Sequence, residues 1–156
     1  MKFVFAILFL AFNFHTNAQC DSIAPLNQQV LNFAQTNLKK KVGRGECWDL
    51  AKYALESCGA VWDYKFEYGK LLTKEECLMP GDIIQFKDVK IKYKEGKTTY
   101  SVTMDQHTAI VNKVLSSDEV ELIHQNTAYT GKKVGVSMLK FSTIYKGKYM
   151  IYRPQN

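Results

Sequence analysis

Hydrophobic and polar positions alternate along the chain with two different periods, and the period changes near residue 80. Between residues 26 and 41, apolar side chains recur every three or four positions, which is the spacing of one helix face. Gly43 and Gly45 follow and would end this helix. Residues 46–58 repeat the helical spacing, and Gly59 stands where a left-handed C-cap would be. The first part of the chain therefore predicts two helices.

The turn signal Pro80-Gly81-Asp82 marks a change to the period of two that is typical of strands. We expect Asp82 to cap this turn in a structural role. Strands are predicted at 83–86, 90–94, 98–103, 108–111, 119–125, 135–139 and 149–153, with a hairpin around Glu95-Gly96. Residues 60–79 are predicted to be irregular, and their aromatic residues could line a groove or belong to the core. Helices followed by strands indicate an α+β fold, with N-terminal helices packed on an antiparallel β-sheet.

The N-terminus has the features of a secretory signal. Lys2 precedes an apolar run at 3–14, and Ala18 offers a small residue at a cleavage point before Gln19. The run is too short for a membrane span, and Gln19 stands where a lipid-attachment motif would have Gly or Ala before Cys20. We therefore expect a signal peptide at 1–18 and a single soluble domain at 21–156, secreted or periplasmic.

The formal net charge of +6 favours an anionic partner, such as a cell-wall glycan with acidic stem peptides. Nucleic acid is the rival interpretation. It is disfavoured by the export signal and by the scatter of the lysines in short runs such as 39–41 and 132–133.

Four cysteines, Cys20, Cys47, Cys58 and Cys77, remain after removal of the signal. Export permits disulfides. The surroundings of Cys47 argue that it is free, in which case Cys58 and Cys77 could pair and leave Cys20 spare. The sequence leaves this pairing open.

Cys47 carries the strongest signal for chemistry. Gly43 and Gly45 precede it and a helical pattern follows it, so it falls at a helix N-terminus. Unpaired backbone N–H groups and the helix dipole stabilise a thiolate there, and the thiolate is the nucleophilic form. The same amides could stabilise an oxyanion. The alternative is a buried or disulfide-bonded cysteine. Asp49, two residues into the helix, is assigned to helix capping.

Two histidines remain in the mature chain, and both follow the Cys47 helix. His107 begins one strand and His124 lies near the end of the next, so antiparallel pairing would bring them together. Strand alternation places His124 and Asn126 on one face and Gln125 on the other. Hence His124 or Asn126 is expected to orient His107.

A zinc site at Cys47, His107 and His124 is disfavoured, because the chain has no close-spaced ligand pair such as His-x-x-x-His or Cys-x-x-Cys. We therefore expect neither a metal nor a cofactor.

Four segments together resemble the CHAP and NlpC/P60 families of papain-like amidohydrolases: 45–51 around Cys47, 80–86 from the Pro-Gly-Asp turn, 107–111 and 124–126. The resemblance covers most of the mature chain and implies a papain-like α+β fold that cleaves amide bonds in peptidoglycan. It implies Cys47 as nucleophile and His107 as base. The third position falls on His124, as in NlpC/P60, or on Asn126, as in CHAP.

The sequence also departs from these families. Glu46 stands where CHAP members often have Gln, and an acidic neighbour opposes thiolate formation unless it points away. Lys41 stands where papain has its oxyanion glutamine, so a second oxyanion donor is unassigned.

We expect a monomer that acts on peptidoglycan or a peptide, without nucleic acid and without stable membrane insertion. The alternatives are a non-catalytic binding or inhibitory module on the same fold, and an amide hydrolase with a substrate outside the wall.

Overall fold

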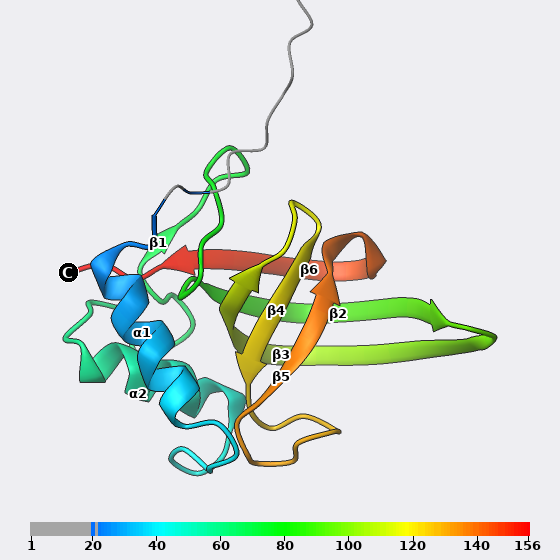
Figure 1. The fold of residues 1–156 in the computed structure, drawn as a ribbon, viewed down its shortest axis with the longest axis horizontal. Coiled ribbons are helices and arrows are strands. Elements are labelled where there is room, and N and C mark those ends of the chain that lie inside the picture. The colour runs from blue at the N-terminus through cyan, green and yellow to red at the C-terminus, as the bar shows by residue number, and fades with distance from the viewer. Residues whose placement is uncertain (1–19, 21) are drawn as a thin grey trace, which may run out of the picture.

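The structure, a computed structural model, describes residues 20 and 22–156. The predicted signal peptide at 1–18 lies outside the described residues. Two helices, α1 (Pro25–Thr36) and α2 (Cys47–Ser57), lie against one side of a six-stranded sheet (Figure 1). In the part of the chain that the structure describes, no helix has the length and apolar character to cross a membrane.

Helix α1 buries Val30, Leu31 and Ala34 and ends at Thr36, earlier than the predicted residue 41. After Thr36 the backbone pairs with a distant residue, Val134, instead of continuing the helix. The Lys39 N–H donates to the Val134 carbonyl (2.8 Å), and the Lys40 carbonyl accepts the Val134 N–H (2.8 Å).

Helix α2 agrees with the prediction to within one residue at each end. Gly59 has φ 69°, which confirms the left-handed C-cap. Asp49 accepts the backbone N–H groups of Arg44 (2.7 Å) and Glu46 (3.4 Å) and pairs with the Arg44 guanidinium (2.9 Å). Asp49 therefore has the capping role expected from the sequence.

The sheet has the order β1-β6-β2-β3-β4-β5, and every neighbouring pair is antiparallel. Its strands are β1 (Lys70–Leu71), β2 (Ile83–Glu95), β3 (Thr98–Val114), β4 (Glu119–His124), β5 (Gly135–Lys140) and β6 (Ile144–Arg153). A short 3-10 helix, η1 (Phe141–Thr143), precedes β6. The two-residue strand β1 was not predicted, because two positions are too few to show an alternation. The expected antiparallel sheet with helices packed on it is present.

Strands β2 and β3 are each longer than predicted and form a hairpin that projects beyond the sheet (Figure 1). Each of the two strands joins two segments that were predicted to be separate strands. The reason is Asp88, whose φ of 53° shifts the alternation, so that Phe86 and Val89 both face the same side. We call residues 87–106 the long hairpin.

Each face of the sheet carries its own buried cluster. One lies between the helices and the sheet and includes Ile83, Ile110 and Ile123. The other lies on the opposite face and includes Ile84, Phe86 and Leu122, with Phe141 packed against it. Because both faces are covered, β2 and β3 carry apolar side chains on both sides near 83–86 and 109–111, with Gln85 as the polar exception. Of the aromatic residues between 60 and 79, Trp62 and Tyr68 belong to the first cluster, while Tyr64 and Phe66 are exposed.

Cys20 and Cys77 form a disulfide with their Cα atoms 5.4 Å apart, and Cys47 and Cys58 are free. The Cys58–Cys77 pairing considered from the sequence is therefore wrong. Cys58 follows the last turn of α2, where its thiol donates to the carbonyls of that turn, whereas Cys77 lies against the start of the described chain. Spatial position, which residue spacing does not reveal, decides the pairing.

A buried ionic cluster holds α1, the Pro-Gly-Asp turn and β6 together. The carboxylate of Asp82 is fully buried and accepts from Asn27 Nδ2 (2.8 Å), from Arg153 Nε (3.0 Å) and Nη2 (2.8 Å), and from the Met79 N–H (2.9 Å). The structural role predicted for Asp82 is confirmed.

Replacing Asp82 by Ala should lower the free energy of unfolding by about 3–5 kcal/mol, because it leaves the Arg153 guanidinium and the Asn27 amide without their buried partner. Urea denaturation measures this loss. Lys113→Ala is the control. It removes an exposed ion pair with Glu121 (3.0 Å) and should cost less than about 1 kcal/mol. Equal losses from the two variants would contradict the role assigned to the cluster.

Candidate active site

Cys47, His107, His124 and Asn126 all line one cavity of about 1040 Å³, which we call the cleft. They come from different elements. Cys47 begins α2, His107 lies in β3, His124 ends β4, and Asn126 follows that strand. The fold thus brings to one cavity all four site residues that the sequence singled out.

Gln125 attaches the start of α2 to the end of β4. Its fully buried amide donates from Nε2 to the carbonyls of Val42 (3.0 Å) and Glu46 (2.7 Å), and its Oε1 accepts the Val42 N–H (3.1 Å). Cys47 directly follows Glu46, and His124 directly precedes Gln125. These bonds therefore set the position of the thiol relative to the histidines.

The two histidines belong to a hydrogen-bonded chain that crosses three strands. His107 Nε2 lies 2.9 Å from His124 Nδ1, and His124 Nε2 lies 3.0 Å from Ser137 Oγ in β5. The Phe86 ring stacks on the His107 ring with centroids 6.3 Å apart. Of the two residues considered for orienting His107, the structure places His124 against it.

This chain restricts the protonation states that could serve catalysis. Because His124 occupies Nε2 of His107, only Nδ1 of His107 is available to accept a proton from Cys47. With Nδ1 bare, His107 carries its proton on Nε2 and donates it to His124 Nδ1. His124 must then hold its own proton on Nε2, where Ser137 Oγ accepts it.

Asn126 contacts Glu46 instead of His107. Its Nδ2 donates to Glu46 Oε2 (2.7 Å), while Lys132 Nζ lies 3.1 Å from Glu46 Oε1. Asn126 therefore helps to hold the acidic side chain that precedes Cys47. Glu46 still raises the pKa of Cys47, but less than burial does.

Burial also decides the charge state of the site. It raises the pKa of the Cys47 thiol, and it outweighs the backbone amides of Thr108, Trp48 and Cys47 that favour the thiolate. The expectation of a stabilised thiolate at this helix N-terminus is therefore wrong for the free protein.

The same cause lowers the pKa of both histidines. Burial brings the pKa of His107 to about 4, and burial together with the neighbouring His107 brings that of His124 to about 3. At neutral pH the site therefore holds a neutral thiol and two neutral imidazoles. Among the hydrogen bonds of the described residues, none joins Cys47 Sγ to either ring.

A buried polar network behind the thiol was not anticipated from the sequence. The Tyr68 hydroxyl lies 2.9 Å from Thr108 Oγ1 and donates to Gln85 Oε1 (3.1 Å), and Thr108 Oγ1 also donates to Gln85 (2.7 Å). Because the Thr108 amide favours the thiolate of Cys47, the network supports the backbone that faces the sulfur. Burial raises the pKa of Tyr68 well above its usual range.

Ser137 was also missed. Alternation in the predicted strand groups Ser137 with Gly135 and Leu139, and the more apolar face of Val136 and Met138 proves to be the exposed one. No sequence signal distinguished Tyr68 from the other aromatic residues of its segment.

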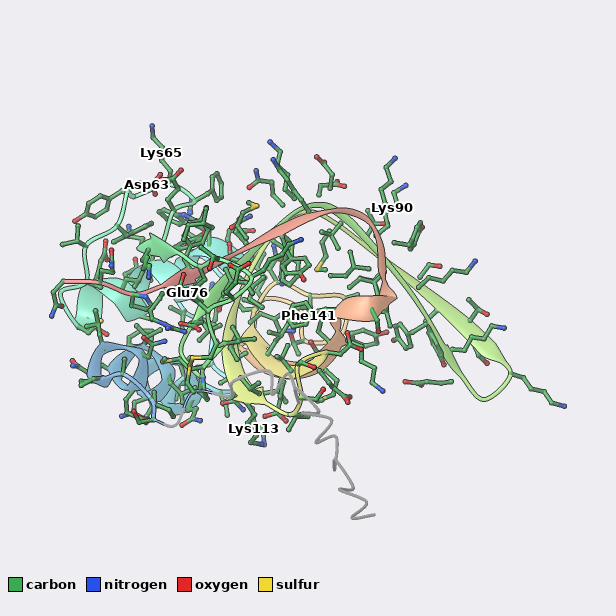
Figure 2. The ribbon with its side chains drawn as sticks, turned by 90° about the horizontal axis from the view of Figure 1, so that it is seen from above. Asp63, Lys65, Glu76, Lys90, Lys113 and Phe141 are labelled. Atoms are coloured by element: carbon green, nitrogen blue, oxygen red, sulfur yellow. A yellow bond between two sulfur atoms is a disulfide. The ribbon has the colours of Figure 1, made fainter. Side chains whose placement is uncertain are left out.

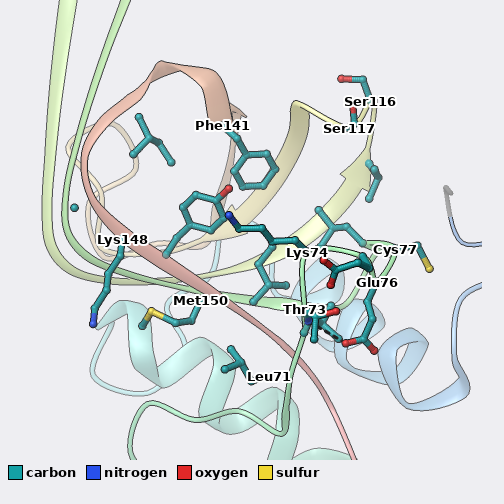
Figure 3. A pocket seen from close by; sticks show the side chains of 18 residues that line it. Leu71, Thr73, Lys74, Glu76, Cys77, Ser116, Ser117, Phe141, Lys148 and Met150 are labelled. Atoms are coloured by element: carbon teal, nitrogen blue, oxygen red, sulfur yellow. Dashed lines mark hydrogen bonds between the residues drawn. The ribbon is translucent and has the colours of Figure 1, made fainter. Parts of the chain in front are cut away.

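A second cavity of about 1030 Å³ lies between the loop after β1, the β3–β4 turn and β6 (Figure 3). Its lining includes Leu71, Phe141 and Met150. Of its two acidic residues, Glu75 and Glu76, the second is already bound by Lys70 and by the Thr73 N–H. Cys47 and the histidines line only the cleft, which is therefore the better candidate for catalysis. Within residues 20 and 22–156, no group of three or more His, Cys, Asp or Glu side chains could hold a metal ion.

Residues 23–156 match the model of a family described as the AIM3/BBC1 cysteine proteinase-fold domain. Among solved structures, the crystal structure of Ly7917 with the hydrolyzing product of MDP aligns with a TM-score of 0.50 and 18% identity, over 82% of this chain and 62% of that chain. A second crystal structure of Ly7917 has a TM-score of 0.48 and 16% identity, over 81% and 62%. The chain thus spans less than two thirds of that protein's length, and the likeness concerns the fold. No curated protein matches the sequence significantly.

The protonation states that catalysis by His107 requires can be tested by ¹⁵N NMR, because the chain without residues 1–19 has only His107 and His124 as histidines. In ¹⁵N-histidine-labelled protein at neutral pH, both rings should carry their proton on Nε2. Ser137→Ala should raise the fraction of His124 protonated on Nδ1 by about fivefold, since one neutral hydrogen bond is worth about 1 kcal/mol. Ser117→Ala, an exposed serine in the β3–β4 turn, should leave the spectrum unchanged. A His107 ring protonated on Nδ1 in the parent protein would contradict the assignment.

The charge state of Cys47 predicts a simple pH dependence of alkylation. With a raised thiol pKa and a lowered His107 pKa, the thiolate fraction should increase roughly tenfold per pH unit up to at least the ordinary thiol pKa of about 8.5. Iodoacetamide rates measured in a Cys58→Ala background report on Cys47 alone. A rate that levels off in mildly acidic buffer would instead indicate a preformed thiolate–imidazolium pair.

Proposed function

The chain belongs to the family of AIM3/BBC1 cysteine proteinase-fold domains, and from this premise we propose that it is an exported cysteine hydrolase that cleaves amide bonds in peptidoglycan. One observation carries the proposal. A free thiol at the head of α2 shares a cleft with a hydrogen-bonded pair of histidines. The resemblance to CHAP and NlpC/P60 enzymes implies the same nucleophile, Cys47, and the same base, His107, and its NlpC/P60 form implies His124 as the third residue.

In the proposed reaction, Cys47 Sγ attacks the amide carbonyl carbon while its proton moves to His107 Nδ1. The imidazolium that forms donates from Nε2 to His124, and then protonates the departing amine. This leaves a thioester on Cys47, which water hydrolyses with His107 as base. The backbone amides of Cys47 and Trp48, which favour a thiolate, would also favour the oxyanion.

The neutral resting state determines when the proton moves. Because the pKa of Cys47 is raised and that of His107 is lowered, transfer accompanies the attack on the carbonyl. Sγ and Nδ1 must therefore come within hydrogen-bonding distance once substrate occupies the cleft. Catalytic hydrogen bonds often tighten in this way when substrate binds. The proposed step needs no cofactor.

Three observations favour peptidoglycan as the substrate. The sequence resembles wall amidohydrolases in four segments. Ly7917, whose fold is similar, has been crystallised with the hydrolysis product of MDP, a peptidoglycan fragment. The net charge of +6 favours a polymer that bears carboxylates.

The disulfide supports the proposed export. A bond between Cys20 and Cys77 forms and persists in oxidising compartments, which accords with a signal peptide at 1–18. The Cys20 thiol is then unavailable for lipid attachment. We therefore propose a soluble secreted or periplasmic protein. We also propose that it acts as a monomer.

The raised pKa of Cys47 and the missing thiol–imidazole hydrogen bond favour one rival, a non-catalytic module that binds the same wall polymer through the same fold. It would bind peptidoglycan without cleaving it.

The decisive experiment compares release of muropeptides from purified sacculi by the mature protein and two cysteine variants. Cys47→Ala should reduce release on the order of a thousandfold or more, because it removes the nucleophile. Cys58→Ala is the matched control and should retain activity, because that thiol lies outside the cleft.

Equal release by Cys47→Ala and the parent protein would end the assignment of the nucleophile. Binding of the parent protein to sacculi without any release would support the non-catalytic rival.

A further inference from the structure

One side of the long hairpin and of the adjoining part of β6 carries a row of lysines. We call Lys87, Lys90, Lys92, Lys146 and Lys148 the lysine face. In the sheet register, Lys87 lies opposite Lys148, and Lys90 lies opposite Lys146. All five are exposed or partly exposed, and Lys90 points away from the body of the molecule (Figure 2). Figure 1 shows that the hairpin carries part of this face well beyond the helices.

Like charges directly opposite each other on neighbouring strands destabilise a sheet. In the part of the chain that the structure describes, no salt bridge involves any of the five lysines. Asp88, the acidic residue between Lys87 and Lys90, also remains outside these ion pairs. The folded protein therefore keeps two pairs of facing cations uncompensated, and an anionic ligand would relieve their repulsion.

The residues between the lysines indicate the kind of anion. On β3, Thr103 lies opposite Lys90 and Ser101 lies opposite Lys92, so hydroxyl groups accompany the cations on this side. The hairpin aromatics Tyr93 and Tyr100 stack on each other at 5.2 Å and belong to the other side. Membrane binding favours apolar side chains beside the cations, and single-stranded nucleic acid favours aromatic ones. A face of lysines and hydroxyls fits a hydrated, flexible polyanion.

The opposite side of the hairpin lines the cleft, through Ile91, Tyr93, Val102 and Met104. A polymer held on the lysine face therefore lies one sheet thickness from the cavity that contains Cys47. Neighbouring chains of the same polymer can reach the cleft around the edge of the hairpin.

We propose that the lysine face binds carboxylate-bearing peptidoglycan and holds the protein on its polymeric substrate. This inference rests on the proposed function for the identity of the polymer.

The test measures binding without catalysis, in a Cys47→Ala background, by sedimentation with lipid-free sacculi at low and high salt. The charge-removing variant is Lys90→Gln/Lys92→Gln/Lys146→Gln. The matched control, Lys41→Gln/Lys65→Gln/Lys133→Gln, removes the same charge from exposed lysines on other elements. Thermal unfolding checks that both variants fold.

The lysine-face variant should bind with a dissociation constant raised about tenfold or more, and with a weaker salt dependence. The control variant should bind like its parent, and soluble polyglutamate should displace the parent from sacculi. Equal binding by both variants would overturn the proposal. So would tighter binding to vesicles of anionic phospholipid than to sacculi, which would assign the face to a membrane.

The two hypotheses fail separately. Suppose that the parent protein releases muropeptides and that the lysine-face variant binds sacculi as tightly as its parent. This result would overturn only the binding inference. Binding that depends on the lysine face, without any release by the parent protein, would leave the inference intact and count against hydrolysis.

Discussion

The arrangement of the site depends on one buried amide. Gln125 is fully buried and makes three hydrogen bonds to the backbone of Val42 and Glu46, more than 75 residues earlier in the chain. A buried amide must satisfy its donors and acceptors, because water cannot replace a lost partner there. The bonds therefore specify where α2 begins relative to β4. Cys47 and His124, the sequence neighbours of these partners, acquire their relative positions as a consequence.

The burial that orders the site also determines its electrostatics. It raises the pKa of Cys47 and lowers that of His107 to about 4, so neither group is charged in the free protein at neutral pH. A neutral pair avoids the cost of placing ions in a poorly hydrated cleft. The hydrogen bonds to His124 and Ser137 then matter, because they occupy Nε2 of His107 and both ring nitrogens of His124, so that only Nδ1 of His107 remains to accept the Cys47 proton. Proton transfer during attack is the chemistry that this state allows.

The sheet serves different purposes on its two sides. Near α1 and α2 both sides are covered by apolar clusters, whereas the long hairpin leaves the covered region. The turn of the backbone at Asp88 changes which residues face each side. One side of the hairpin therefore continues the apolar lining of the cleft, while the other carries the lysine face. The shift of the alternation at Asp88 thus separates the proposed contact with the polymer from the proposed chemistry.

By itself, the sequence determined the helices, most of the strands and the order of the reactive residues. Side-chain direction in a helix or strand follows local backbone geometry, so periodicity reveals it, as it did for α2 and for the pairing of β3 with β4. Gly59 and Asp49 were predictable for the same reason, because caps are local. Only the tertiary structure decided that α1 ends at Thr36, because Val134 competes for its last turn. It also decided that Cys77 pairs with Cys20, that His124 contacts His107 while Asn126 contacts Glu46, and that the thiol of Cys47 is neutral. Each of these outcomes depends on neighbours from distant parts of the chain, and burial sums over all of them.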